Sequence, residues 1–580
     1  MPVPDLKETC RKLLEWAEPL LTEEESLKTQ KVINRFLLPG GEGEKLQNEL
    51  IEWAQPPHVL NWFAPVWRDL YLAGPESLVI NSNVFYYLKS KLDEKIHSQA
   101  YIASSLISCV YDFIAVIDKK ELTVDMQKGS PLCMNQYRYL FSSTRIPCQG
   151  TDKFKTSSCR KHIVVMHNQR IYKLNIMDEK GLKRSPAAIE SDLNDILSCS
   201  SMKGQNLGLL TTMLRDDWAN SRAELLEICP DNKKIMSIIE EASFILALDE
   251  KSPEQIVDIS EQLLHGAGKD RFFDKSLQFV VFKNGKTGIN FEHTGVDGSV
   301  MLRLVGHIHD NLDKVSFSEN DVAINNEKRA PATIKEIEFD LNDNLKKTIN
   351  NAEASFKKHI ANTQTRVLNF TQFGKNQIKQ FGVSPDAFVQ LALQLAEYKL
   401  YGKCYSAYEA VMSRTFLDGR LDALHTVSTE SIEFIRNIEN TDCSKQVKID
   451  SLIKASKKHV GRAGECRSGQ GVYAHFLALK YRYKIAGQKL GITTIPELFT
   501  DKGYQALTHS VVCTSTTSDY GVELAGYGPI VEDGYGIRYF NRTDSIRFNM
   551  TSRTAMQKNL DKMKMYIEQS LLEMAELMQP

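Results

Sequence analysis

The sequence lacks the features that define several large protein classes. Its 580 residues carry a formal net charge of −1, so we expect no general attraction to nucleic acid or anionic lipid. The eleven cysteines form no CxxC pair, which argues against a zinc site or a disulfide framework and favours a reducing compartment. We therefore expect no metal site.

Two further absences concern membranes and targeting. No run of about 18 apolar residues is evident, so we expect no transmembrane segment. The first residues have neither the basic nor the apolar region of a secretory leader, and they already show the pattern of an amphipathic helix. A cytoplasmic location is the resulting expectation, and an organellar form trimmed of its transit peptide is the alternative.

The chain is too long for a single hydrophobic core, which predicts two domains. Residues 162–176 and 277–293 each combine two β-rich runs with a turn signal and predict hairpins. Strands are expected again at 508–516, 522–531 and 535–549, helices at 5–55, 94–125, 385–415 and in the last 25 residues, and a linker or crossover near 315–340. This mixture predicts an α/β fold with mixed sheets.

The octamer FEHTGVDG (291–298) contains a candidate general base. His293 follows a predicted strand and precedes a predicted helix, and Asp297 comes four residues later, within reach of the imidazole in a first helical turn. A carboxylate on one ring nitrogen leaves the other free to accept a proton. The alternative is a strand-end histidine whose ring is satisfied by the backbone. His307 and His309, on the following helix, are expected to be packing or surface residues.

Two other motifs suggest ligand binding. Lys375 and Lys379 lie one helical turn apart and can reach one phosphate, although such a pair is often only a solvated face. In VCTSTTSDYG (512–521), Thr514 and Thr516 alternate with Ser515, so the serine points to the opposite side of the strand. A hydroxyl there can donate to a developing oxyanion, and a polar edge strand is the alternative.

Together these segments resemble the choline/carnitine acyltransferase family, and the match runs in order along nearly the whole chain. The general character is nearest to the branch that transfers palmitoyl groups in mitochondria, notably in CTSTTS and DGYG. The matching blocks are VPDLKET (3–9), SPLCMNQYRYLFSSTRIP (130–147), KHIVVMHNQRIYKLN (161–175), GLLTTMLRDDWA (208–219), FEHTGVDG, FGKNQIK (373–379), SPDAFVQLALQLAEY (384–398), AYEAVMSRTFLDGR (407–420), CTST (513–516) and YGPIVEDGYGIRYF (527–540).

The resemblance implies two related α/β domains, like those of coenzyme A-dependent acyltransferases, with an active-site tunnel between them. Helices in residues 1–90 would pack with the C-terminal domain, residues 91–335 would form the domain that carries the catalytic histidine, and residues 336–580 would carry the coenzyme A and acceptor sites. Acyl-CoA would be a co-substrate, with no tightly bound cofactor. We expect a monomer that acts on small molecules.

The resemblance also assigns roles to residues. His293, held by Asp297, would deprotonate the acceptor alcohol, and Ser515 would meet the tetrahedral oxyanion. The 3′-phosphate of coenzyme A and its adenine end would be bound by Lys375, Lys379 and Asp386.

The sequence departs from the carnitine enzymes at the acceptor site. Leu421 and Ala423, in GRLDAL, replace two threonines, and Ala474, in GVYAHFLALK, replaces an arginine; these three normally bind the carnitine carboxylate. A buried carboxylate without a charged donor is costly. The aromatic rings expected near a quaternary ammonium remain, and with the hydroxyl segment they complete the expected acceptor site: Tyr408, Thr514 and Tyr527. His425 or Arg420 is an alternative donor for a carboxylate.

Small residues at the acyl pocket, Ala525 and Gly526, favour medium or long acyl groups over acetyl. The sequence thus predicts an acyl-CoA-dependent O-acyltransferase that uses a small quaternary-ammonium alcohol, with a choline-like acceptor favoured over carnitine. The alternatives are a carnitine O-acyltransferase with a rearranged acceptor pocket, a non-catalytic acyl-CoA-binding paralogue, and an acyl-CoA hydrolase.

Overall fold

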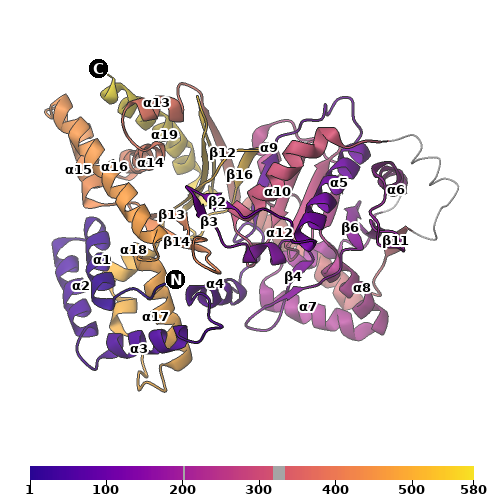
Figure 1. Ribbon diagram of the computed structural model, residues 1–580, viewed down its shortest axis with the longest axis horizontal. Helices are drawn as coiled ribbons and strands as arrows, with labels where there is room; N and C mark the ends of the chain where they lie inside the picture. Colours follow the sequence, from indigo (N-terminus) through magenta and orange to yellow (C-terminus); the bar gives the residue numbers. More distant parts are fainter. Residues whose placement is uncertain (200–202, 318–332, 580) are drawn as a thin grey trace.

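The computed structural model describes residues 1–199, 203–317 and 333–579. Within these residues, most strands belong to two mixed sheets that lie side by side (Figure 1). This arrangement confirms the predicted α/β class with mixed sheets. Part of the expected linker at 315–340 lies outside the described residues.

The first sheet has a parallel centre, β6-β8-β9, flanked by antiparallel strands. It takes strands from distant parts of the chain, because β1 and β16 pair at one edge. In spatial order its strands are β11 (Ile334–Ile337), β7 (Arg170–Asn175), β6 (His162–His167), β8 (Ile245–Asp249), β9 (Leu277–Phe282), β10 (Thr287–Phe291), β1 (Val84–Leu88) and β16 (Val522–Gly526).

The second sheet repeats this plan, with a parallel centre β13-β15-β17 and antiparallel neighbours. In order its strands are β12 (Thr363–Phe370), β18 (Ile546–Arg553), β17 (Tyr535–Asn541), β15 (Val512–Thr516), β13 (Ala407–Met412) and β14 (Leu421–His425). Two short ribbons, β2-β3 (Met126–Gln127, Ser130–Pro131) and β4-β5 (Ser143–Ile146, Lys153–Thr156), lie outside both sheets.

Helices cover both faces of the first sheet and one face of the second. The first sheet packs on one side against α5 (Gln99–Asp118), α6 (Pro186–Ser198) and α10 (Gly298–Asn311), and on the other against α7 (Arg215–Ile228), α8 (Pro230–Glu241), α9 (Ile256–Leu264) and α12 (Asp343–Ala361). The second sheet packs against α13 (Lys375–Gln380), α14 (Pro385–Tyr401), α15 (Thr429–Glu439), α16 (Lys445–Arg467) and α19 (Gln557–Met578).

The N-terminal helices form a separate apolar cluster with the C-terminal half of the chain. Figure 1 shows α1, α2 and α3, in indigo, beside α17 and α18, in orange. The expected helical region 5–55 divides where Thr22 and Glu25 form a capping box and where Gly41 starts a further helix. The members of this cluster are α1 (Leu6–Ala17), α2 (Glu23–Phe36), α3 (Glu42–Ala54), α4 (Phe63–Leu72), α17 (Val472–Ala486) and α18 (Lys502–Thr508).

Both predicted hairpins are confirmed. β6 and β7 meet at Asn168 and Gln169, which have positive φ, and β9 and β10 meet at Gly285, with φ +84°. The single long helix expected over 385–415 is wrong. It ends at Tyr401 because Gly402 adopts the left-handed conformation, with φ +71°, and strand β13 follows.

The expectation of no membrane-length apolar segment needs a correction. Within the described residues, α5 alone is long and apolar enough to span a bilayer by length and composition. Most of this helix is buried, because its residues pack in the core on one face of the first sheet. Core helices of this kind pass the same test as membrane spans.

Candidate active site

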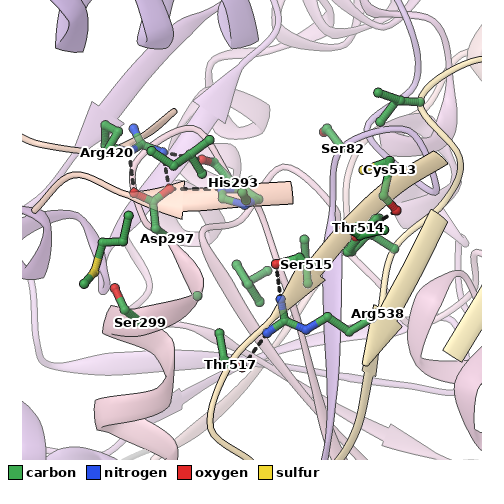
Figure 2. Close-up of a pocket in the computed structure, with 18 of the residues that line it drawn as sticks. Ser82, His293, Asp297, Ser299, Arg420, Cys513, Thr514, Ser515, Thr517 and Arg538 are labelled. Carbon is green, nitrogen blue, oxygen red and sulfur yellow. Dashed lines mark hydrogen bonds and ion pairs between the residues drawn. The ribbon is translucent and has the colours of Figure 1, made fainter. Parts of the chain in front are cut away.

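A cavity of about 210 Å³ lies between the two sheets, with walls from β1, β10, α10, β13, β14, β15, β17 and α4. Figure 2 shows His293 and Asp297 on one side of it and the β15–β17 segment on the other. Seven of the residues predicted from the sequence line this inter-sheet cavity: His293, Asp297, Tyr408, Leu421, Thr514, Ser515 and Tyr527.

His293 lies in the short connection between β10 and α10, and Asp297 occupies the N-cap position of α10. The imidazole stacks on Tyr71, with ring centroids 5.5 Å apart. Its Nδ1 lies 3.6 Å from Oδ1 of Asp297, so Nε2 is the nitrogen left to accept a proton. A side chain at position 298 would clash with the Tyr86 hydroxyl, 2.6 Å from the site of a Cβ, and glycine therefore allows this close approach.

Asp297 is fixed by two residues that sequence analysis did not connect with it. Arg420 donates from Nε to Oδ2 at 2.9 Å and from Nη2 to Oδ1 at 3.0 Å, and Gln136 donates to Oδ2 at 2.8 Å. Arg420 also donates to the carbonyls of His293 and Thr294. These Arg420 hydrogen bonds all go to the loop of residues 293–297. This argues against the alternative considered from the sequence, in which Arg420 would bind the carboxylate of a substrate.

The electrostatics of the site favour a neutral imidazole beside an ionised carboxylate. Burial lowers the pKa of His293 below its ordinary value, opposed by the Asp297 charge. Burial alone would raise the pKa of Asp297, but the charge and hydrogen bonds of Arg420, with smaller contributions from His293 and Gln136, bring it below its ordinary value. A neutral, oriented histidine is the state that a general base requires.

This pKa shift predicts the pH dependence of activity. A general base works only while it is unprotonated, so activity falls as the pH drops through the pKa of His293. Because burial lowers that pKa, the acid limb of kcat/KM for the acceptor should have its midpoint below 6.5, the ordinary value for histidine. Steady-state rates between pH 4.5 and 8 measure this limb, and a midpoint above 7 would contradict the role assigned to His293.

Ser515 faces the cavity because side chains alternate along β15. Cys513 and Ser515 point into the cavity, whereas the Thr514 hydroxyl points to α14, where it accepts from Gln390 at 2.9 Å and donates to the Tyr408 carbonyl at 2.8 Å. The predicted alternation is therefore confirmed. The Ser515 hydroxyl oxygen accepts a hydrogen bond from Arg538, a cavity residue that sequence analysis did not single out.

Three of the six acceptor residues predicted from the sequence, Tyr408, Leu421 and Ala423, lie on the β13–β14 pair. In β13 and β14, Met412 pairs with Leu421 and Ala410 with Ala423, so hydrocarbon occupies this face; Ala423 does not itself line the cavity. The Cys513 Sγ lies 3.0 Å from the hydroxyl of Tyr408. The Tyr527 hydroxyl donates to the carbonyls of Ile537, at 3.1 Å, and Cys513, at 3.3 Å.

The other predicted acceptor and acyl-pocket residues, Ala474, Ala525 and Gly526, do not line the cavity. Ala474 is buried on α17, where its N–H donates to Asp422 at 3.1 Å. Ala525 and Gly526 belong to β16, which pairs with β1, and neither lines the cavity as it stands. The considered alternative His425 is also buried outside the cavity.

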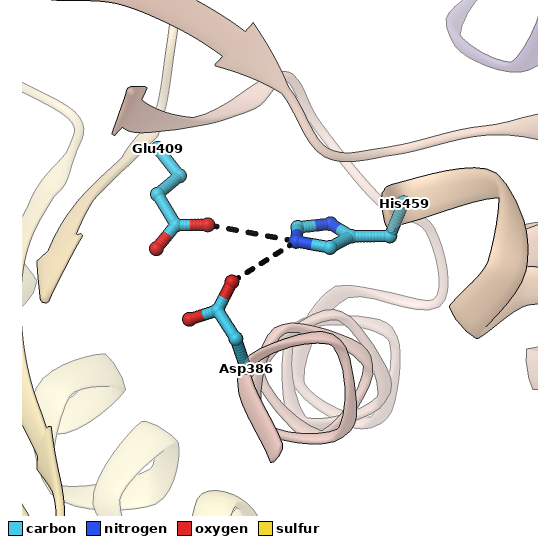
Figure 3. A group of neighbouring side chains, drawn as sticks. All are labelled: Asp386, Glu409 and His459. Carbon is cyan, nitrogen blue, oxygen red and sulfur yellow. Dashed lines mark hydrogen bonds and ion pairs between the residues drawn. The ribbon is translucent and has the colours of Figure 1, made fainter. Parts of the chain in front are cut away.

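The predicted coenzyme A residues lie away from the cavity. Lys375 and Lys379 belong to α13, with Lys379 exposed, and Asp386 is the second residue of α14. Figure 3 shows the carboxylates of Asp386 and Glu409 directed at Nε2 of His459, at 3.2 and 3.6 Å. These three side chains have donor atoms of the kind that hold metals, but they are already bonded to one another and the Tyr539 hydroxyl donates to both carboxylates.

Comparison with known proteins agrees with this geometry. Residues 1–569 match the family model described as choline/carnitine O-acyltransferase. Carnitine O-acetyltransferase of Columba livia is 32% identical over 100% of this chain and 93% of its own length. Choline O-acetyltransferase of Sus scrofa is 29% identical over 99% and 91%, and human mitochondrial carnitine O-palmitoyltransferase 2 is 28% identical over 95% and 88%.

These identities are too similar to separate the acetyl and palmitoyl branches. Among solved structures, the trichothecene 15-O-acetyltransferase TRI3 of Fusarium sporotrichioides aligns at 10% identity over 89% of this chain and 95% of its own, with a TM-score of 0.41. The family match extends over nearly the whole sequence and includes the His293 loop. The chain therefore belongs to the choline/carnitine O-acyltransferase family and is an acyltransferase.

Proposed function

We propose that this enzyme transfers an acyl group between coenzyme A and a small alcohol, with His293 as the general base. The observation that carries the proposal is that a partly buried His293, next to the Arg420–Asp297 pair, shares a cavity with Ser515. A base and an oxyanion donor on opposite walls are the parts that acyl transfer needs.

The reaction proceeds through one tetrahedral intermediate. The alcohol gives its proton to Nε2 of His293 while its oxygen attacks the thioester carbonyl carbon. The Ser515 hydroxyl donates to the resulting oxyanion, and Arg538 supports this orientation because it donates to the lone pairs of the same oxygen. The C–S bond then breaks, and the imidazolium returns the proton to the coenzyme A thiolate. No acyl-enzyme forms, because both substrates bind together.

Coenzyme A is assigned to the α13–α14 region. Lys375 and Lys379 stand one turn apart, an arrangement that suits the two ammonium groups to one phosphate. Asp386 would contact the adenine end, where its carboxylate is partly exposed. Acyl-CoA acts here as a substrate rather than as a resident cofactor, and the enzyme is proposed to work as a cytoplasmic monomer.

A choline-like acceptor is favoured over carnitine. The wall formed by Ala410, Met412 and Leu421 is hydrocarbon, and Tyr408 and Tyr527 line the same cavity; an aromatic face stabilises a cation by about 0.5–2 kcal/mol. Neither Leu421 nor Ala474 supplies a donor for a carboxylate. The Columba livia and human relatives are named carnitine O-acetyltransferase and carnitine O-palmitoyltransferase 2, so a carnitine enzyme with a rearranged pocket is the second candidate.

For the acyl group, the small size of Ala525 and Gly526, taken alone, favours a medium or long chain. The support is the small size of these side chains on β16, where a bulky residue would close the space beside β1. This preference rests on those two residues alone.

The acceptor is tested by thiol release from acyl-CoA with choline, its uncharged isostere 3,3-dimethylbutanol, carnitine, ethanol or no acceptor. We expect choline to give the highest kcat/KM, about 2–30-fold above dimethylbutanol, because an aromatic wall stabilises the cation. Equal rates without acceptor would identify a hydrolase, and a preference for carnitine would contradict the choline assignment. Binding of acyl-CoA without turnover would identify a non-catalytic paralogue.

A further inference from the structure

Arg538 is a buried guanidinium in the inter-sheet cavity that has no carboxylate partner among the residues the structure describes. It is 5% exposed, donates from Nη1 to the Ser515 hydroxyl and from Nη2 to the Thr517 hydroxyl at 2.5 Å, and its Nε has no hydrogen-bond partner. Other buried arginines of this chain pair with a carboxylate; Arg145, for example, pairs with Asp152, Arg414 with Asp125 and Arg420 with Asp297.

Among residues 1–199, 203–317 and 333–579, no carboxylate forms an ion pair with this guanidinium. Glu409 interacts with Arg538 electrostatically, but its partners are His459 and Tyr539, and burial and the neighbouring Asp386 raise its pKa well above the ordinary value. A buried cation without a counterion is costly, and a bound anion would remove that cost. Binding of an anionic group beside Arg538 would therefore be favourable.

The position of Arg538 along the strands indicates whether the anionic group belongs to the acceptor or to the acyl group of acyl-CoA. Residues two apart on β15 lie about 6–7 Å apart on the same face. Cys513 lies at the end of the cavity that contains Tyr408, which we assign to the acceptor. Arg538 pairs with Ser515 in the β15–β17 register, and its Nη2 donates to Thr517, two residues beyond Ser515 on the side away from Cys513. Figure 2 shows Ser515 between His293 and the Arg538 guanidinium.

The apolar residues next to Arg538 belong to the same cluster as Ala525, which the sequence places in the acyl pocket. Its guanidinium lies 5.8 Å from the centre of the Phe540 ring, which packs in the same apolar cluster as Tyr86, Phe291 and Ala525. The direct bond between Arg538 and Ser515 places a bound anion only a few ångströms from the thioester carbonyl. A spacer of one or two methylene groups bridges that separation.

We propose that Arg538 binds the distal carboxylate of a short dicarboxylic acyl group, so that the enzyme prefers acyl-CoAs of the malonyl or succinyl class. This inference rests on the proposed acyl transfer and names its donor. It also opposes the longer apolar chain suggested by Ala525 and Gly526, because the two ideas predict opposite orders for succinyl-CoA and octanoyl-CoA.

The test compares acyl-CoAs matched in chain length, succinyl with butyryl and malonyl with propionyl, in the wild type, Arg538→Met and Arg538→Lys. With choline as acceptor, we expect a kcat/KM ratio of succinyl to butyryl of about 10 or more in the wild type, because charge-assisted hydrogen bonds contribute on this scale. The ratio should fall to one or below in Arg538→Met and keep an intermediate value in Arg538→Lys. Arg547→Met is the matched control, since Arg547 pairs with Glu523 and does not line the cavity.

Binding to the inactive His293→Ala enzyme separates this inference from the proposed function. There the dissociation constants of succinyl-CoA and butyryl-CoA should differ in the same direction, and the added Arg538→Met change should remove the difference. A failure of acyl transfer would abolish turnover of every acyl-CoA without changing these constants. Thermal unfolding and coenzyme A binding show whether each variant is folded.

Three outcomes would overturn the inference. An equal loss with succinyl-CoA and butyryl-CoA in Arg538→Met, with unchanged binding preference, would reduce Arg538 to positioning Ser515. With butyryl-CoA as donor, a selective loss of carnitine relative to choline would show that the carboxylate belongs to the acceptor, which would contradict its assignment to the acyl group. Faster turnover of octanoyl-CoA than of succinyl-CoA would also contradict it.

Discussion

Replacing His293 by alanine should reduce kcat about 10³-fold or more while the dissociation constant of coenzyme A stays within about twofold of the wild type. The reason is that His293 is the histidine that lines the cavity, with a carboxylate 3.6 Å from one ring nitrogen, while its neighbour Asp297 is already paired with Arg420. Steady-state thiol release measures the first quantity and calorimetric titration with coenzyme A the second.

His509→Ala provides the matched control for this experiment. His509 is exposed and pairs with Asp533 outside the inter-sheet cavity, so its loss should leave kcat unchanged. Residual turnover of His293→Ala within tenfold of the wild type, in a variant that unfolds at the wild-type temperature, would disprove the role of base.

Replacing Asp297 by asparagine should lower kcat about 10²-fold or more and also destabilise the protein. The amide removes the charge that orients and stabilises the imidazolium, and it leaves the buried Arg420 guanidinium without a counterion. Breaking a buried ion pair on one side costs about 3–5 kcal/mol. Chemical denaturation and steady-state kinetics at pH 7 measure the two effects.

The double variant Asp297→Asn with Arg420→Met distinguishes catalysis from stability. Removing both charges relieves the unpaired cation, so stability should recover in part, whereas kcat should stay low because the imidazole still lacks its carboxylate. Recovery of activity together with stability would mean that Asp297 serves only the fold.

The local part of the active site was predictable from sequence, because His293, Asp297 and Ser515 lie in short motifs at a strand end and on an alternating strand. The partners that make them work were not. Arg420 reaches Asp297 across 123 positions of the chain, and its contact depends on how the two sheets meet. Arg538 stands in a strand whose pattern indicates only a buried sheet, so its unpaired state appears only when every neighbouring side chain has been placed.

The fold likewise has features that the sequence predicts and features that it does not. Turn chemistry at Gly285 identified a hairpin correctly, since the requirement for positive φ is local. The long helix expected across Gly402 was wrong, because the helical periodicity before the glycine and the alternation after it share many apolar residues. The pairing of β16 with β1 joins segments more than 400 residues apart, and no local pattern encodes it.

The central claim, direct acyl transfer from coenzyme A to an alcohol at His293, is tested most directly by a single turnover. Excess enzyme is mixed with butyryl-CoA and choline, quenched over milliseconds to seconds, and analysed for ester, free coenzyme A and protein mass. The account predicts that ester and coenzyme A appear together in equal amounts, with no acylated protein and neither product formed by His293→Ala. Release of coenzyme A ahead of ester, or an acylated protein that precedes it, would contradict the account.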